Sequence, residues 1–275
     1  MTEKLYYNDA YLEKSKAHVL AVKERYDDEH SALILDKTIF FPTGGGQPGD
    51  IGTITSLAEG ASTSNKDAPY SASVPKTIEI SNTIIQRTAT GREDIYHLYP
   101  SSDDGVISQW AKARTSVEIV LDFSRRYRLM RMHTALHVLC AVVPYPVTGG
   151  AIRIDKSHLD FDTSAGGTLD KAQITEKLNA LVKQNFTVTT YTLKAADFLE
   201  KRRHMPSLVR TASVSPPVDA AGNIRLVQIG PQSNLIDLQA CGGTHVRALG
   251  EIDFITVKKI ENKGKHNRRV RLTID

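Results

Sequence analysis

The sequence predicts an α+β protein in which a small β-barrel-like domain is followed by a two-layer α/β domain. Up to residue 121, β-rich runs alternate with glycine- and proline-rich loops. After residue 122 comes a helix-length run with apolar residues at helical spacing, and helix and strand patterns then alternate to residue 275. A chain of 275 residues is long enough for two domains, and we expect them over residues 1–121 and 122–275.

The first domain is expected to consist of short strands around one glycine loop. Two β-rich runs within residues 32–54 are joined by Phe40-Phe-Pro-Thr-Gly-Gly-Gly-Gln-Pro-Gly49. Residues 60–76 are rich in Ser, Ala, Asp and Pro, which indicates a surface insertion. A polar turn is expected at 103–105, and further strands are expected over 77–85, 94–98 and 117–121.

The second domain is expected to begin with a helix that Ser124 caps and Pro144 ends. Helices are also expected over 170–185 and 195–202. Strands are expected over 151–154, 159–161, 187–193, 224–229 and 235–237, followed by a hairpin of 251–261 and 268–274 with residues 262–267 at its tip.

Composition indicates a folded, soluble, cytoplasmic protein. Hydrophobic residues make up 40% of the chain, and no apolar run reaches the roughly 20 residues that a bilayer requires. Two cysteines give no disulfide framework. The net charge of +4 is weak evidence for a polyanionic partner, but the cations are clustered. The clusters fit phosphate contacts or, alternatively, solvated charge: Arg125, Arg126, Arg128 and Arg131, and Lys258, Lys259, Lys263, Lys265, Arg268, Arg269 and Arg271.

Two pairs of potential metal ligands share one spacing. His133 and His137 stand four residues apart, as do Cys241 and His245 around a Gly-Gly-Thr segment. Residues at i and i+4 of a helix project from one face, and zinc favours three or four nitrogen and sulfur ligands. A buried stripe supports the helix: Leu129, Met132, Leu136, Leu139 and Val143.

The alternative for the helix pair is that His133, His137 and Cys140 are satisfied core residues. The second pair favours one zinc ion held by His133, His137, Cys241 and His245, because packing gives no reason for that combination. Cys140 is expected to be a buried apolar residue outside the set. The number of ligands leaves open whether the ion is catalytic or structural. A zinc-protease motif is excluded, because Thr134 stands where the glutamate would follow the first histidine.

The glycine loop lacks the Gly-Lys-Ser/Thr ending of a nucleotide-binding loop. A plain tight turn is one interpretation. The other is recognition of a small substrate, because Thr43 and Gln47 place a hydroxyl and an amide on either side of Gly44, Gly45 and Gly46.

Four motifs together resemble the alanyl-tRNA editing proteins, which are free-standing relatives of the editing domain of alanyl-tRNA synthetase. They are Phe41-Pro-Thr-Gly-Gly-Gly-Gln-Pro48, the run from Asp122 with Arg125-Arg126, Met130-Arg131 and His-Thr-Ala-Leu-His137, Cys-Gly-Gly-Thr-His-Val246, and Glu261-Asn-Lys-Gly-Lys-His-Asn-Arg-Arg269. The resemblance extends from about Leu35 to the C-terminus. The N-terminal glycine-loop domain makes the chain similar to the medium-length type.

The resemblance implies zinc-dependent hydrolysis, in trans, of the ester in Ser-tRNA(Ala) and Gly-tRNA(Ala), in the second of the two domains. It places one Zn²⁺ per chain on His133, His137, Cys241 and His245, and makes the glycine loop a candidate for recognition. Thr134 or backbone amides are expected to help hold the scissile carbonyl. The acceptor end of tRNA(Ala) is the expected partner of a monomeric protein, through Lys263, Lys265, Arg268 and Arg269.

Two departures from the family pattern bear on the pocket, since Leu249 stands where threonine is usual and Phe41 where tyrosine is common. Two other functions compete with the first. One is deacylation of another mischarged tRNA, such as Ser-tRNA(Thr), because the threonyl-tRNA synthetase editing domain shares the His-x-x-x-His core. The other is a non-catalytic, zinc-stabilised RNA-binding module.

Overall fold

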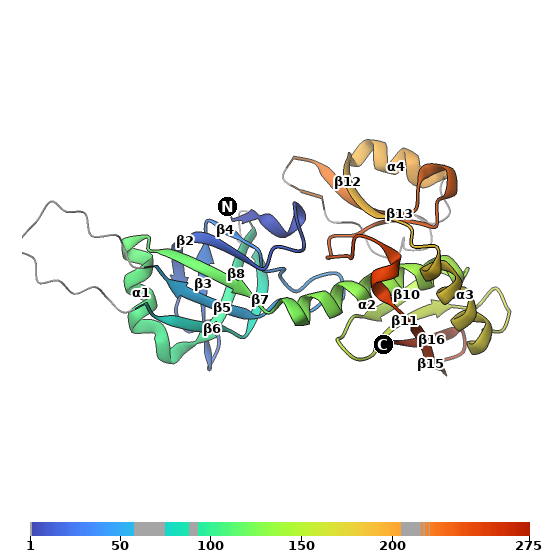
Figure 1. Ribbon diagram of the computed structural model, residues 1–275, viewed down its shortest axis with the longest axis horizontal. Coiled ribbons are helices and arrows are strands. Elements are labelled where there is room, and N and C mark those ends of the chain that lie inside the picture. The colour runs from blue at the N-terminus through green and yellow to red at the C-terminus, as the bar shows by residue number, and fades with distance from the viewer. Residues whose placement is uncertain (1, 58–74, 88–92, 205–215, 217, 220) are drawn as a thin grey trace, which may run out of the picture. The chain divides into compact units, whose positions relative to one another are not determined.

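The computed structural model describes residues 2–57, 75–87, 93–204, 216, 218–219 and 221–275, and its elements are labelled in Figure 1. The chain divides into two compact units. Unit 1 is Met1–Gly44 with Pro48–Arg126, and unit 2 is Gly45–Gln47 with Tyr127–Asp275. Three residues of the glycine loop therefore belong to unit 2. Most of the predicted insertion, residues 60–74, lies outside the described residues.

Unit 1 contains a seven-stranded sheet with the order β6-β5-β9-β2-β3-β8-β7. Its strands are β2 (Lys14–Lys23), β3 (His30–Leu35), β5 (Gly52–Ser56), β6 (Thr77–Ile80), β7 (Asn82–Arg87), β8 (Glu93–Pro100) and β9 (Ser116–Leu121). A short parallel pair, β1 (Glu3–Lys4) and β4 (Lys37–Thr38), and two 3-10 turns, Leu5–Tyr7 and Ser101–Asp103, complete the connections.

The sheet of unit 1 is curled but not closed, which corrects the expected barrel. Strand β2 pairs with β9 over Lys14–His18 and with β3 from Val19 onward, with a register shift between Val19 and Ala21. The end strands β6 and β7 are separated along the chain by Ser81 alone, so the sheet must curl until its two ends meet. Strand β6 pairs with β5 at one end of the sheet, and β7 pairs with β8 at the other end. Among the described strands no ladder joins β6 to β7, so the sheet stays open.

Helix α1 (Asp104–Ala113) packs on this sheet where the sequence predicted only a polar turn at 103–105. Its Ile107 and Trp110 join the core formed by strand residues such as Val19, Leu33 and Ile119. Two buried side chains on ten residues give too short an apolar stripe for a periodic pattern to be recognised.

Unit 2 is built on helix α2 (Phe123–Val142), whose first turns belong to unit 1. It has two sheets, with the orders β10-β11-β16-β15 and β12-β13-β14. The remaining elements are β10 (Val147–Ala151), β11 (Ser157–Asp162), α3 (Lys171–Lys183), β12 (Val188–Lys194), α4 (Ala195–His204), β13 (Asn223–Ile229), β14 (Asp237–Ala240), β15 (Ile255–Asn262), β16 (Asn267–Ile274) and the 3-10 turns Gln232–Asn234 and Leu249–Ile252.

The α+β prediction is confirmed, and five local details differ from expectation. The predicted strand 77–85 is two strands, β6 and β7, separated by Ser81. Asp122, not Ser124, caps α2, because its carboxylate accepts the Arg125 backbone N–H at 3.0 Å and Ser124 already lies inside the helix. Strand β10 ends at Ala151, where the predicted 151–154 strand was to begin, and β14 starts at Asp237, where the predicted 235–237 strand was to end. The predicted strand 251–261 begins only at Ile255, because a 3-10 turn occupies Leu249–Ile252.

A buried amide of helix α3 bonds to the backbone of β15. The Asn179 side chain accepts from Ile255 N at 2.9 Å and donates to Ile255 O at 2.8 Å, so it takes the place of a neighbouring strand. Ile174, Leu178 and Val182 form the buried face of the same helix.

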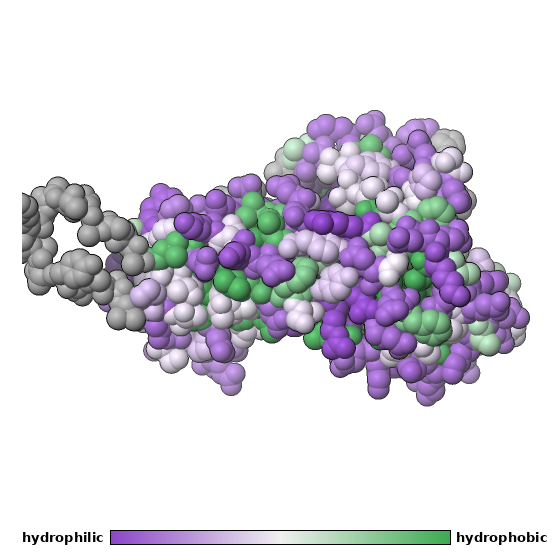
Figure 2. Space-filling model, viewed as in Figure 1, coloured by the Kyte–Doolittle hydropathy of each residue, from purple (hydrophilic) through white to green (hydrophobic). Residues whose placement is uncertain are grey.

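The surface mixes polar and apolar side chains. On the face seen in Figure 2, hydrophilic and hydrophobic residues are interspersed. The exposed large apolar residues are scattered along the described chain: Tyr7, Tyr26, Val106, Val120, Leu199, Val218 and Phe254. None of the helices described is both long and apolar enough to cross a membrane.

Candidate metal centre

Helix α2 presents two histidines on a rigid support. Its apolar stripe is buried as predicted, at Leu129, Met132, Leu136, Leu139 and Val143. One turn apart on the same helix, His133 and His137 are 6% and 5% exposed, with ring centroids 5.3 Å apart. Because the helix backbone is fixed by core packing, the two imidazoles have little freedom to separate.

The second pair lies on the turn that follows β14. Arg225 on β13 fixes this turn: one guanidinium nitrogen donates to Cys241 O at 2.7 Å and to Gly243 O at 3.0 Å. Gly243 is needed for space and not for an unusual backbone angle, because a Cβ there would lie 2.2 Å from His133 Cε1. The turn can therefore approach α2 closely enough for Cys241 and His245 to face the two helix histidines.

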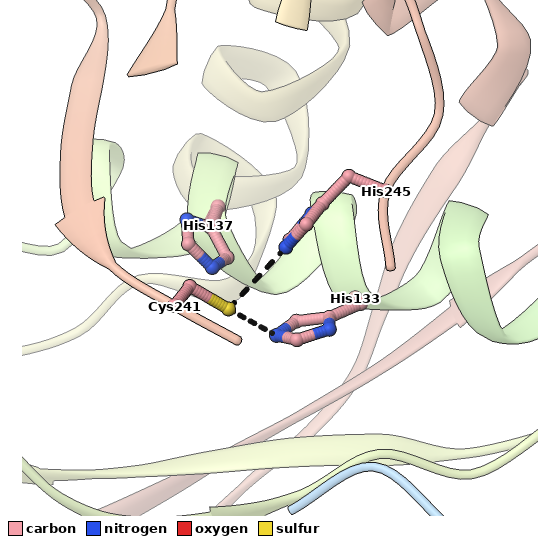
Figure 3. Close-up of side chains that lie close together, drawn as sticks. All are labelled: His133, His137, Cys241 and His245. Atoms are coloured by element: carbon pink, nitrogen blue, oxygen red, sulfur yellow. Dashed lines mark hydrogen bonds between the residues drawn. The ribbon is translucent and has the colours of Figure 1, made fainter. Parts of the chain in front are cut away.

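The four side chains converge as Figure 3 shows. Their candidate ligand atoms all lie within 4.8 Å of one another, and they could hold a metal ion. Cys241 Sγ is 3.4 Å from His133 Nε2 and 3.4 Å from His245 Nε2. Tetrahedral zinc, with bonds of about 2.3 Å to sulfur and about 2.0–2.1 Å to nitrogen, would place such atoms about 3.5 Å apart. The chemistry and the spacing of the cluster thus fit one zinc ion.

Each histidine is oriented by a polar partner at its other ring nitrogen. His133 Nδ1 lies 2.9 Å from Gln47 Oε1, and His137 Nδ1 lies 3.0 Å from Asp237 Oδ2. His245 Nδ1 lies 3.1 Å from the Thr134 hydroxyl, which donates its own proton to Met130 O at 2.9 Å and so accepts from the ring. All three Nδ1 atoms are therefore donors, which leaves each Nε2 lone pair for the centre of the cluster.

Charge within the cluster favours a thiolate and a cation beside it. Burial raises the pKa of Cys241, but its electrostatic interactions and hydrogen bonds with the neighbouring histidines outweigh burial and hold that pKa well below its usual value. Burial and His133 lower the pKa of His245, so its ring stays neutral and able to coordinate. For His137, burial is outweighed by Asp237 and Cys241, which raise its pKa to about 10, so a metal ion bound at Nε2 would displace a proton from this ring. The carboxylate of Asp237 and the thiolate of Cys241 thus stabilise a positive charge at the position of His137.

Sequence reasoning did not identify Thr134 or Asp237 as histidine partners. Asp237 carried a recognisable signal, because a carboxylate inside the apolar run Leu235–Leu238 needs a buried partner. Its side chain is fully buried and also accepts from Gln239 Nε2 at 2.9 Å. Cys140 is buried on α2 and lies outside the four-residue cluster, as expected.

The glycine loop is divided between the units. Thr43 belongs to unit 1, where its hydroxyl donates to Thr83 O and accepts from Gly49 N. Gly45 and Gly46 have φ angles of 58° and 81°, a region that favours glycine. In unit 2, Gly46 O accepts the Ile152 N–H at 2.9 Å, and the Gln47 side chain is completely buried.

Several predicted phosphate-binding cations already have protein partners. Arg126 is fully buried in an ion pair with Asp50 and so is not a solvent-facing phosphate ligand. Arg131 is partly exposed and donates to Ile252 O and Asp275 O. On β16, Arg269 makes two 2.7 Å contacts with Asp160. The hairpin tip keeps Lys263 and Lys265 exposed.

Comparison with known proteins identifies the family. Residues 224–271 match the family described as "Threonyl and Alanyl tRNA synthetase second additional domain". The chain is 32% identical over 278 residues to "Alanyl-tRNA editing protein AlaX-M" of Methanosarcina acetivorans, covering 100% of this chain and 99% of that protein. The chain belongs to the alanyl-tRNA editing protein family. The AlaX-M protein of Saccharolobus solfataricus is 30% identical over 280 residues, with the same coverage.

The editing-protein family also aligns with part of a larger enzyme. The chain is 30% identical over 273 residues to "Alanine--tRNA ligase" of Pyrobaculum arsenaticum, which covers 94% of this chain but 25% of that protein. The segment matched by the family model includes Cys241 and His245, and α2 with the other two cluster residues lies outside it.

Proposed function

We propose that this editing protein is a zinc-dependent deacylase that acts in trans on mischarged tRNA(Ala), with Ser-tRNA(Ala) and Gly-tRNA(Ala) as substrates. The single observation that carries the proposal is the convergence of three histidines and a cysteine, each histidine with a polar partner at Nδ1. The names of its relatives, alanyl-tRNA editing proteins and an alanine–tRNA ligase, supply the substrate class.

In this proposal His133, His137, Cys241 and His245 hold the zinc ion. Zinc bound there would supply a Lewis acid for the ester carbonyl or for water. Thr134 is completely buried and its hydroxyl is engaged by Met130 and His245, so its role is to position His245. Backbone amides then remain as the candidates for holding the scissile carbonyl.

Recognition in this proposal uses both predicted domains, the glycine-loop domain of residues 1–121 and the editing domain of residues 122–275. Thr43, Gly44, Gly45 and Gly46 are proposed to approach the aminoacyl end. Lys263, Lys265, Arg268 and Arg269 are proposed to contact phosphates of the acceptor stem, with the exposed lysines contributing most because Arg269 is already paired. The protein is proposed to act in the cytoplasm as a monomer.

The proposed substrates are the amino acids that a synthetase site for alanine discriminates against poorly. A site sized for alanine cannot strongly exclude smaller glycine, and one added hydroxyl is a weak reason for rejecting serine. A separate hydrolytic site that accepts the mischarged ester would restore accuracy without a change in the synthetase.

The test measures release of labelled serine, glycine and alanine from tRNA(Ala). We expect rapid release of serine and glycine with alanine spared, and loss of that activity in a Cys241→Ala, His245→Ala variant. Cys140→Ala is the matched control, because it removes a buried thiol outside the cluster and should leave the rates unchanged.

The test also separates the competing functions. If zinc is fully bound and none of the three amino acids is released, the proposal fails for tRNA(Ala). Release of serine from Ser-tRNA(Thr) would then identify the threonine system, which the shared threonyl and alanyl family model also covers. Tight binding of tRNA without any hydrolysis would identify an RNA-binding module.

A further inference from the structure

Gln47 is separated from the metal cluster by a long stretch of sequence but lies against it in the fold. It is the last residue of the three-residue segment Gly45–Gln47 that belongs to unit 2, although unit 1 residues flank that segment on both sides along the chain. The segment is fixed by the 2.9 Å hydrogen bond from Ile152 N to Gly46 O. The Gln47 side chain is 0% exposed, so every polar atom in it needs a protein partner.

The amide of Gln47 contacts both halves of the ligand set. Its Oε1 lies 2.9 Å from His133 Nδ1, on the helix, and 3.1 Å from the backbone nitrogen of Thr244, on the turn. Its Nε2 donates to the Thr244 hydroxyl at 2.8 Å. One side chain thereby joins helix α2 to the segment that carries Cys241 and His245.

The backbone contact determines the direction of every other bond. A backbone N–H can only donate, so the Gln47 atom facing Thr244 N must be the carbonyl oxygen. That oxygen can only accept, so His133 Nδ1 must carry the proton. The lone pair of His133 is consequently on Nε2, the atom that lies 3.4 Å from Cys241 Sγ.

Gly243 leaves open the space that this arrangement needs. A Cβ at Gly243 would lie 2.5 Å from His133 Nδ1 and 2.9 Å from Gln47 Oε1, the two atoms of the hydrogen bond itself. Any larger residue would displace the ring or the amide.

We infer that Gln47 is a positioning residue of the metal centre, which fixes the tautomer and orientation of His133 and ties the helix ligands to the turn ligands. The inference rests on the proposal that the cluster binds zinc. It differs from the recognition role expected from the sequence, because the amide is fully buried and three of its four hydrogen-bonding positions are taken by His133 and Thr244. In this inference the glycine loop contributes to the metal centre through the contact of Gln47 with His133.

The test measures affinity for Zn²⁺ alone, by competition with a chromophoric chelator, in the full-length chain. Removal of such an outer partner typically lowers metal affinity about 10–100-fold, and we expect that loss in Gln47→Leu. Gln47→Glu should lose less, because a carboxylate oxygen accepts the same two hydrogen bonds and the Thr244 hydroxyl can turn to donate. Gln228→Leu is the matched control, since its amide bonds only to Gly230 O among the contacts described and lies outside the cluster.

Unchanged Zn²⁺ affinity in Gln47→Leu would overturn the inference, and with a raised KM for the ester it would return Gln47 to substrate recognition. Failure of the wild-type chain to bind Zn²⁺ would overturn it as well. If Gln47→Leu does not fold, Gln47→Asn replaces it with the same expected loss, because the shortened amide cannot reach His133. The readout needs no ester, so a chain that hydrolyses nothing but loses Zn²⁺ affinity in Gln47→Leu would refute the proposed function and leave this inference intact.

Discussion

Each of the two units buries a polar cluster, and the two clusters satisfy their charge in different ways. In unit 1 the guanidinium of Arg126 is enclosed by Asp50 and by the carbonyls of Ala10 and Ile39, so that all three nitrogens donate. In unit 2 four side chains instead direct potential ligand atoms at one another. The outer ring nitrogen of each of the three histidines has a polar partner.

The Arg126–Asp50 cluster of unit 1 is complete without a ligand, whereas the four-residue cluster of unit 2 has the side chains to bind one. Arg126 and Asp50 neutralise each other, so nothing further has to bind. The four converging side chains of unit 2 do not cancel one another in this way, and they could hold a metal ion at their centre. Burial alone does not distinguish the two clusters, because Arg126, Asp50 and the three histidines are all buried, and only Cys241 is partly exposed.

Removing one member of the self-neutralised pair should have the largest effect on stability. Arg126→Met leaves Asp50 as an unpaired buried charge, and we expect the free energy of unfolding to fall by about 3–5 kcal/mol. Denaturant unfolding monitored in unit 1 measures it. The double variant Arg126→Met, Asp50→Asn has no buried charge and should be more stable than the single variant. Equal stability of the two variants would show that lost packing, and not the charge, accounts for the effect.

Removing one member of the converging cluster should act on the metal first. Structural zinc sites bind with about 10–16 kcal/mol, so one of four ligands contributes about 3 kcal/mol, or roughly 100-fold in affinity. His137→Ala should therefore lower Zn²⁺ affinity about 100-fold or more, measured by chelator competition. Cys140→Ala, on the same helix, should bind Zn²⁺ as the wild type does. A His137→Ala variant with wild-type affinity would exclude His137 from the ligand set.

A buried histidine of unit 1 sharpens the comparison because no anionic group among the described residues raises its pKa. Burial lowers the pKa of His97 to about 4, and its ring bonds to Thr38 Oγ1 and Leu33 O. Between pH 6.5 and pH 4 the unfolded chain binds a proton that the folded chain does not. The free energy of unfolding of unit 1 should therefore fall by about 3 kcal/mol as the pH is lowered through this range.

The measurement for His97 is amide exchange of the unit 1 sheet at pH 6.5 and pH 4.5. His97→Gln can make both hydrogen bonds without a titratable ring, so it should show a weaker dependence on pH. The same dependence in the variant and in the wild type would assign the acid sensitivity to other groups.

The smallest expected effect is at the carboxylate behind His137. Asp237→Asn keeps the shape and the contact with Gln239 but removes the negative charge. We expect a loss of Zn²⁺ affinity of about 10–100-fold, towards the lower end if the amide oxygen still accepts from His137. Asp219→Asn, at an exposed turn, is the control. No change in Asp237→Asn would mean that the ring orientation is set by helix packing alone.

The four cluster residues could be predicted because metal ligation needs particular residue types at short, regular spacings. The partners of the histidines could not, since nothing local relates Gln47 to Thr244, 197 residues away. Thr134 was considered for its hydroxyl, but its direction depends on the i−4 carbonyl of Met130, which only the folded helix supplies.

The fold shows the same division between local and distant information. Helix α2 was predictable from five buried apolar residues, whereas α1 has two and was expected to be a turn. The arginine cluster before the metal helix predicts phosphate contacts or solvated charge, although Arg126 is buried. Its partner Asp50 lies 76 residues away, and the sequence gives no sign of that pairing.

The bond between Gln47 and Thr244 has a consequence for the order of events during translation. Gln47, the outer partner of His133, is synthesised early, and the turn that carries Cys241 and His245 is synthesised about 195 residues later. A nascent chain that has reached only α2 can offer two imidazoles but neither the thiolate nor the turn. Because long-range contacts form only when both segments are available, the complete site should assemble late. A partly synthesised chain would then hold metal weakly, because it lacks the thiolate and the third imidazole.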